Sequence, residues 1–131
     1  MVETNTTGPF PWKDFPAIAL AVPMQLLRCQ NCGEHGLRPG EAAALDRAIE
    51  ESIKIYTHGL IETILLREEC SQVALATRLG VTQEYISYLK NGTKLPSYQT
   101  FNLLRLVALV RGSFRALDDT IDQNLINARS A

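Results

Sequence analysis

The stretch that decides the fold spans residues 71–96 and reads SQVALATRLGVTQEYISYLKNGTKLP. Ser71 and Thr82 are residue types that favour helix N-caps, and a short run with helical apolar spacing follows each of them. Gly80 lies between the two runs, where a glycine can adopt the left-handed backbone of a tight turn. Asn91-Gly92 predicts the end of the second helix. We therefore expect two short helices joined by a tight turn, with a shared core of Leu75, Leu79, Val81, Ile86 and Leu89.

The sequence on both sides of this stretch also has helical periodicity. Residues 41–56 place apolar side chains at spacings of three and four, and residues 98–110 do the same. Gly59 is expected to interrupt the first of these helices, because glycine disfavours a helix interior. Further amphipathic segments predict helices over residues 60–69 and 113–128.

The first forty residues have a different composition. Five of the six prolines lie before Gly40, and they exclude long helices there. Residues 17–27 predict one or two short strands, whereas the polar residues 1–9 are expected to form a loose tail. We therefore divide the chain into a small irregular or β-containing lobe at residues 1–40 and a helical domain at residues 41–131. The predicted fold class is mainly α.

Composition and charge narrow the class of protein. The 131-residue chain is 46% hydrophobic and 21% charged, which is typical of a globular protein. No apolar run approaches the ~20 residues that span a bilayer, and the N-terminus has no basic leader region. We therefore expect a cytoplasmic protein with no membrane partner. The net charge is −1, but residues 64–115 carry seven basic and three acidic side chains, which suits local contact with phosphates.

The central stretch resembles the lambda-repressor-like, or XRE, family of helix-turn-helix proteins. The resemblance runs in register over residues 72–96. It is carried by Gln72, Leu75, Ala76, Leu79, Gly80, Val81, Thr82, Gln83, Ile86, Ser87, Leu89, Gly92 and Pro96. It implies a five-helix lambda-repressor-like bundle with the helix-turn-helix unit at about residues 61–111, followed by a C-terminal helix. It also implies that the partner is double-stranded DNA.

In this family the second helix of the motif reads the major groove. Gln83 is then placed to make bidentate hydrogen bonds with adenine, and Glu84 to accept from a cytosine amine or to repel phosphate. Ser87 and Tyr88 lie a turn further along, within reach of a base or a phosphate. The resemblance implies a phosphate contact for Gln72. The other expected DNA-contacting residues are Ser71, Thr82, Asn91, Thr93 and Lys94. They would contact the sugar–phosphate backbone and so position the protein on the DNA.

Several of these residues have a purely structural alternative. Gln83 and Glu84 are also ordinary solvated residues for the start of a helix, and the two N-caps would cap helices under either interpretation. Tyr88 either packs partly on a neighbouring helix or reaches DNA. Tyr85 is expected to be a packing residue.

The segment Cys29-Gln-Asn-Cys32-Gly33-Glu34 has the spacing of a zinc knuckle. A structural zinc ion needs four ligands, however, and the chain has only one such cysteine pair. Cys70 falls in the predicted core and is expected to be a buried apolar residue. We therefore expect no cofactor.

A second resemblance bears on the same segment. A small lobe that ends in Val22-Pro23 and this cysteine pair, followed by a helix and the helix-turn-helix segment, resembles the MqsA-type antitoxins. In those proteins a zinc-binding and toxin-binding lobe precedes a DNA-binding domain, but this chain lacks the first Cys-x-x-Cys of the pattern. The alternatives are a relic of the lobe, a zinc site shared between two chains, or a site that His35 completes with Cys29 and Cys32. A redox switch is a further alternative.

The sequence therefore predicts a transcriptional regulator that binds specific DNA, in the form of a homodimeric repressor of its own or another promoter on a palindromic operator. The helices between residues 98 and 128 are expected to supply the dimer surface. The alternative is an antitoxin of a type II toxin–antitoxin pair, whose main partner is a toxin protein. No enzyme activity is expected, because His35 and His58 are isolated and no nucleophile or phosphate-binding motif is recognisable.

Overall fold

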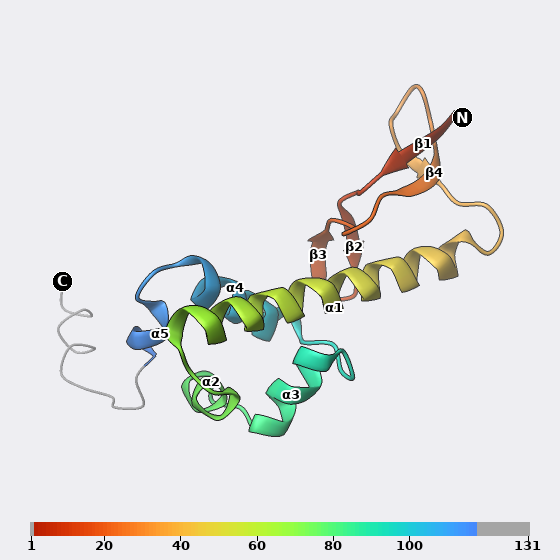
Figure 1. Cartoon of the computed structure of the whole chain (residues 1–131). Coiled ribbons are helices and arrows are strands. Elements are labelled where there is room, and N and C mark those ends of the chain that lie inside the picture. Colours follow the sequence, from red (N-terminus) through yellow and green to blue (C-terminus); the bar gives the residue numbers. More distant parts are fainter. Residues whose placement is uncertain (1, 118–131) are drawn as a thin grey trace.

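Strands occupy the first part of the chain and helices the rest. The computed structural model describes residues 2–117 (Figure 1). The strands are β1 (Val2–Thr6), β2 (Phe10–Trp12), β3 (Phe15–Ile18), β4 (Met24–Arg28) and β5 (His35–Gly36). The helices are α1 (Glu41–Glu68), α2 (Gln72–Leu79), α3 (Gln83–Asn91), α4 (Tyr98–Leu109) and α5 (Ser113–Ala116). Five helices and a small antiparallel lobe agree with the predicted helix-turn-helix bundle. Of the helix expected over residues 113–128, the part beyond residue 117 lies outside the described residues.

The prediction of a loose tail over residues 1–9 is wrong for β1. This strand pairs antiparallel with β4, with Thr4 opposite Leu26, and β4 in turn pairs with β5. Leu26 is fully buried beneath the sheet. Most side chains of β1 are exposed, so its polar sequence carries no apolar alternation from which a strand could be predicted. Backbone pairing, rather than side-chain burial, holds this strand.

A separate two-stranded hairpin, β2 and β3, attaches the lobe to the helices. Phe10 pairs with Ile18, and Trp12 pairs with Phe15 across the turn. The Phe15 ring is buried, and it meets the rings of Tyr98 and Phe101 edge-on at centroid distances of 5.2 and 5.5 Å. The hairpin therefore packs directly on the N-terminal half of α4.

The prediction of two helices separated at Gly59 is also wrong, since α1 is one continuous helix of 28 residues. A glycine in a helix interior costs about 1 kcal/mol relative to alanine. On the opposite side of the helix, Ile53, Thr57, Ile61 and Ile64 form a fully buried stripe that spans the glycine. Burying the three isoleucine side chains of this stripe stabilises the helix by more than the glycine costs.

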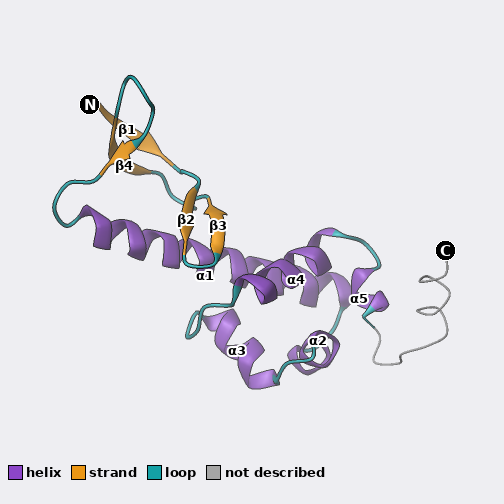
Figure 2. Ribbon diagram, turned by 180° about the vertical axis from the view of Figure 1, so that it is seen from behind, coloured by secondary structure: helices purple, strands orange, loops and turns teal. Residues whose placement is uncertain are grey.

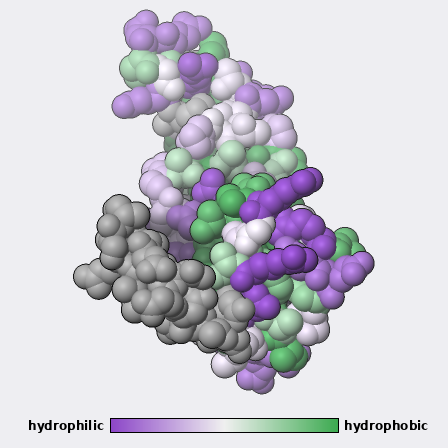
Figure 3. Space-filling view, turned by 90° about the vertical axis from the view of Figure 1, so that its left-hand side faces the viewer, coloured by the Kyte–Doolittle hydropathy of each residue, from purple (hydrophilic) through white to green (hydrophobic). Residues whose placement is uncertain are grey.

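The helix α1 runs from the lobe to the other helices (Figure 2), and two hydrophobic cores share it. Ile49 and Ile53 belong to the core beneath the lobe, whereas Ile61 and Ile64 belong to the core of the helical bundle. Helix α4 contributes Phe101 to the first core and its later residues to the second. The N-terminal half of α1 thus shares a core with the lobe, although the sequence analysis placed the domain boundary before this helix, near residue 40. That boundary stays a prediction. Seen from the α5 end, hydrophilic side chains gather over the distant tip of the lobe, while hydrophobic and hydrophilic side chains mix on the bundle (Figure 3).

Candidate nucleic-acid interface

Helices α2 and α3 begin at hydroxyl side chains that cap their first turns. Ser71 Oγ accepts a hydrogen bond from the Ala74 N–H at 3.1 Å, and Thr82 Oγ1 accepts one from the Tyr85 N–H at 3.1 Å. Gly80, between the helices, has a φ of 74°, in the left-handed region that favours glycine. The two predicted caps and the predicted turn are therefore confirmed.

The orientation of α3 is fixed by its apolar face. Ile86 and Leu89 are fully buried against Leu75 and Ala76 of α2, and α1 and α4 complete the same core. The small side chain of Ala76 lets the backbones of α2 and α3 come close. Because one face of α3 is committed to this core, the residues on its other face lie at the surface.

The exposed end of α3 carries the residues predicted to read bases. Gln83 and Glu84 are exposed at the N-terminal end of the helix, as is the N-cap Thr82, which was predicted to contact the sugar–phosphate backbone. Ser87 and Tyr88 lie further along and are partly buried. The structure therefore groups the predicted base-reading residues on one side of α3. Gln72, predicted to contact phosphate, is the first residue of α2 and is partly exposed.

The two tyrosines of α3 differ in their surroundings. Tyr85 packs against the bundle core, as predicted. Tyr88 faces the loop that follows α3, where the Lys94 ammonium lies 5.0 Å from the centre of its ring. This cation–π contact places a positive charge beside the surface of α3.

The loop after α3 is organised by Asn91. Its Oδ1 accepts hydrogen bonds from the Thr93 N–H at 3.0 Å and from the Thr93 hydroxyl at 2.5 Å. Gly92 ends α3 with a φ of 80°. The Asn91 and Thr93 side chains thus define the shape of the loop, and Lys94 projects its charge from it.

A polar contact that the sequence did not reveal attaches the C-terminal end of α3 to α1. Glu62 accepts an ion-pair contact from the Lys90 ammonium at 2.9 Å, and this contact lowers the pKa of the Glu62 carboxyl. The imidazole Nδ1 of His58 lies 2.8 Å from the Lys90 carbonyl oxygen. His58 and Glu62 are four residues apart on α1, a spacing that indicates a shared helix face but not which partner lies opposite.

Part of the positive charge in this region is used within the fold. The Arg67 guanidinium donates to the carbonyl oxygens of Val107 and Ala108, at the end of α4. Arg78 donates to the Phe114 carbonyl at 2.8 Å and lies 4.7 Å from the centre of the Phe114 ring. These two arginines join helices, so the charge available to DNA is smaller than the sequence count suggests.

The cysteine pair lies on a turn at the tip of the lobe, far along the chain from α3. The backbone N–H of Cys32, the Cys32 thiol and the backbone N–H of Asn31 all hydrogen-bond with the Cys29 sulfur and lower the pKa of the Cys29 thiol. Cys29 is partly exposed and Cys32 is exposed. Cys70 is half-buried against the bundle core, and burial raises the pKa of its thiol.

These thiols alone do not fit a structural zinc ion. Among the side chains that the structure describes, which do not include His35, no three potential ligands of the Cys, His, Asp and Glu types lie close enough to hold a metal. The side chain of His35, the third predicted ligand, lies outside the part of the chain that is described. Two thiolates on one turn supply half of a tetrahedral site.

Comparison with known proteins agrees with the geometry of α2 and α3. Residues 61–105 match the sequence model of the helix-turn-helix family. No curated protein and no solved structure gave a significant match. None of the helices described is both long enough and apolar enough to cross a bilayer. The segment from the second half of α1 to α4, residues 61–105, is therefore an XRE-type helix-turn-helix domain, the DNA-binding module of a regulator.

Proposed function

We propose that this protein is a dimeric transcriptional repressor that occupies a palindromic operator through α3. The observation that carries the proposal is the surface of a capped, well-packed helix-turn-helix. Thr82, Gln83 and Glu84 are exposed together at the end of α3 that enters the major groove in this class of motif. A repressor of this kind acts by excluding the transcription machinery from the promoter.

Base recognition is assigned first to Gln83. Its carboxamide can donate to and accept from the N6 and N7 edge of adenine at once, which is worth about 1–3 kcal/mol of discrimination. Glu84, beside it, can accept from a cytosine amine or exclude phosphate from the wrong register. Ser87 and Tyr88 would contact a base or the thymine methyl group a turn further along.

Contacts with the sugar–phosphate backbone would flank the recognition helix on both sides. Ser71 and Gln72 lie at the N-terminal end of α2, whose helix dipole favours phosphate. Asn91, Thr93 and Lys94 lie in the loop after α3, where Lys94 supplies the positive charge. Such contacts hold the protein in register but carry no sequence information.

The outer face of α4 is the surface that best supports dimerisation. Leu106 and Leu109 of α4, and Val110 directly after it, are 51%, 73% and 48% exposed, although all three are large apolar residues. Leu66 of α1 is also largely exposed. A symmetric dimer formed through this face would present two α3 helices to half-sites about 34 Å apart. The predicted dimer surface over residues 98–128 includes this face.

The proposal is tested by selecting bound sequences from a pool of random DNA duplexes with the full-length protein. The expected result is an inverted repeat whose half-sites are about one helical turn apart. A single unrepeated site would contradict the dimer, and no enrichment of any sequence would contradict specific DNA binding.

The antitoxin alternative is favoured by one feature of the lobe. In the sheet order β1-β4-β5, β1 lies at an edge, and Val2 on it is 41% exposed. An edge strand offers unpaired backbone groups to which a partner protein can add a strand. Co-purification of a small basic protein that is lost when Thr4 is replaced by proline would support this function, because proline removes a backbone donor from the strand. Thr4→Ser is the matched control, since it keeps the N–H.

A further inference from the structure

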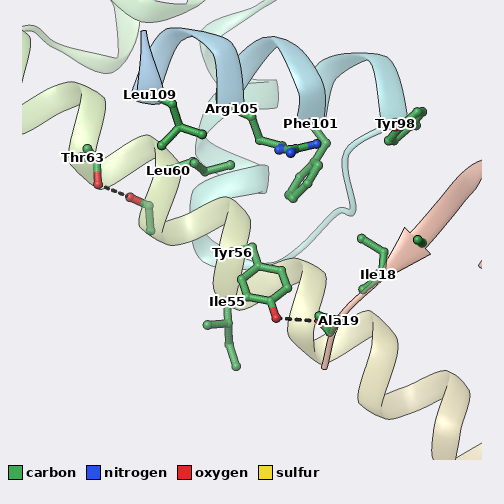
Figure 4. Close-up of a pocket in the computed structure, with 12 residues that line it drawn as sticks. Ile18, Ala19, Ile55, Tyr56, Leu60, Thr63, Tyr98, Phe101, Arg105 and Leu109 are labelled. Atoms are coloured by element: carbon green, nitrogen blue, oxygen red, sulfur yellow. Dashed lines mark hydrogen bonds between the residues drawn. The ribbon is translucent and has the colours of Figure 1, made fainter. Parts of the chain in front are cut away.

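An apolar groove lies where the lobe, α1 and α4 meet (Figure 4). Its volume is about 540 Å³, within the range of sites for small organic ligands. Ile55 and Leu60 of α1, and Phe101 and Leu109 of α4, form its apolar walls. Ala19, just after β3, closes the end nearest the lobe.

Gly59 leaves the α1 side of this groove open. Apart from its two chain neighbours and the helix's own backbone, a Cβ atom built on this residue would meet no atom within 4 Å. No close contact within the chain therefore requires a glycine at this position, although glycine costs α1 about 1 kcal/mol relative to alanine. Gly59 leaves open space at the α1 wall of the groove. An occupant of the groove could therefore come close to the helix backbone at this residue.

The polar groups that line the groove differ in how far their hydrogen-bond donors are already used within the chain. The Tyr56 hydroxyl donates to the Ala19 carbonyl at 2.6 Å, and the Thr63 hydroxyl donates to the Gly59 carbonyl at 2.8 Å (Figure 4). These two donors are used within the chain. Arg105 is the only charged residue among the described residues that line the groove. Its Nη1 donates to Asn102 Oδ1 at 2.9 Å, and a guanidinium has five N–H donors in all, so it retains the capacity to bind an anion.

We propose that this groove binds an amphipathic organic anion, with an apolar body along α1 and α4 and a carboxylate on Arg105. The charge selects this occupant, because an apolar groove with a single guanidinium matches a ligand that has one acidic group on a hydrocarbon body. The ligand would contact the lobe, α1 and α4 at once. Its binding would therefore stabilise the folded protein and raise Tm.

The test uses decanoate, below its micellar concentration, and decanol as the uncharged analogue of equal chain length. Binding to the full-length protein is measured by calorimetry, and Tm is measured in the same solutions. One decanoate per chain is expected, with a rise in Tm. Arg105→Met should weaken decanoate binding about tenfold and leave decanol binding unchanged, because only the carboxylate uses the guanidinium.

Two further variants separate groove binding from unspecific adsorption. Gly59→Leu fills the open wall and should abolish binding of both compounds without lowering the Tm of the free protein. Arg111→Met removes a charge outside the lining of the groove and should bind decanoate like the wild type. Absence of decanoate binding, binding of several molecules per chain, or binding that both Arg105→Met and Gly59→Leu retain would overturn the proposal.

Discussion

The side chains at the start of α3 divide between two roles, capping the helix and facing the solvent. Thr82 points its hydroxyl back to the Tyr85 N–H and so fixes the first turn. Gln83 and Glu84, the next two residues, are exposed. Because Thr82 supplies the cap, the side chains of Gln83 and Glu84 remain available to contact base edges in the major groove of DNA. The caps and the glycine turn were predictable from residue type alone, since few side chains can satisfy a free backbone N–H at a helix start.

The cysteines provide a residue-scale prediction. Backbone amides lower the pKa of the Cys29 thiol, whereas burial raises that of Cys70. Since the thiolate is the reactive form, Cys29 should be alkylated by iodoacetamide at a lower pH than Cys70. The rate at each site is followed by peptide mass spectrometry across a pH series. Alkylation of the two sites with the same pH midpoint in the folded protein would contradict this, and the unfolded protein, in which they should behave alike, is the control.

The helices α1 and α3 depend on each other at the scale of whole elements. Glu62 and His58 of α1 hold the last turn of α3 through Lys90. This attachment was not predictable, because it joins residues about thirty positions apart that have no shared pattern in the sequence. The continuity of α1 was also not predictable from local propensity. The helix is held by a buried stripe whose partners come from the lobe and from α2, α3 and α4, and that tertiary contribution exceeds the local cost of Gly59.

Gly59 gives the prediction that belongs to α1. Gly59→Ala should raise the free energy of unfolding by about 0.5–1 kcal/mol, because alanine favours the helix and its Cβ meets open space. Urea denaturation of the variant and the wild type measures the difference. Gly80→Ala is the informative comparison, because its φ of 74° strains an alanine and should lower stability instead. A decrease in stability for Gly59→Ala would show that α1 is not continuous at this point.

At the scale of the whole molecule, α1 and α4 run through two cores. The lobe rests on Ile49, Ile53 and Phe101, and the helix-turn-helix rests on residues further along the same two helices. The division of the chain into a strand-containing lobe and helices followed from proline and glycine content. The packing of the lobe on α1 and α4 did not, because it is set by contacts between distant residues such as Phe15 and Phe101.

The dimer proposal is tested at the same scale. Leu109→Lys places a charge on the exposed apolar face of α4 and should convert a dimer into monomers at micromolar concentration without loss of helicity. Sedimentation equilibrium measures the mass, and circular dichroism checks the fold. Val22→Lys, at another exposed apolar residue, in the lobe, is the matched control and should remain dimeric. A wild-type protein that is monomeric at every concentration, with and without DNA, would contradict the proposal.

The central claim is that α3 reads DNA sequence, and its most direct test is equilibrium binding of the wild type and Gln83→Ala to DNA from upstream of the protein's own gene. Gln25→Ala, an exposed glutamine of β4, is the matched control. We predict binding that resists competitor DNA, a loss of about 1–3 kcal/mol of discrimination in Gln83→Ala, and no change in Gln25→Ala. A salt series should give the same slope for all three proteins, about −0.9 per phosphate contact, because Gln83 contacts a base and not a phosphate. Weak binding that is indifferent to DNA sequence and to Gln83 would contradict the account.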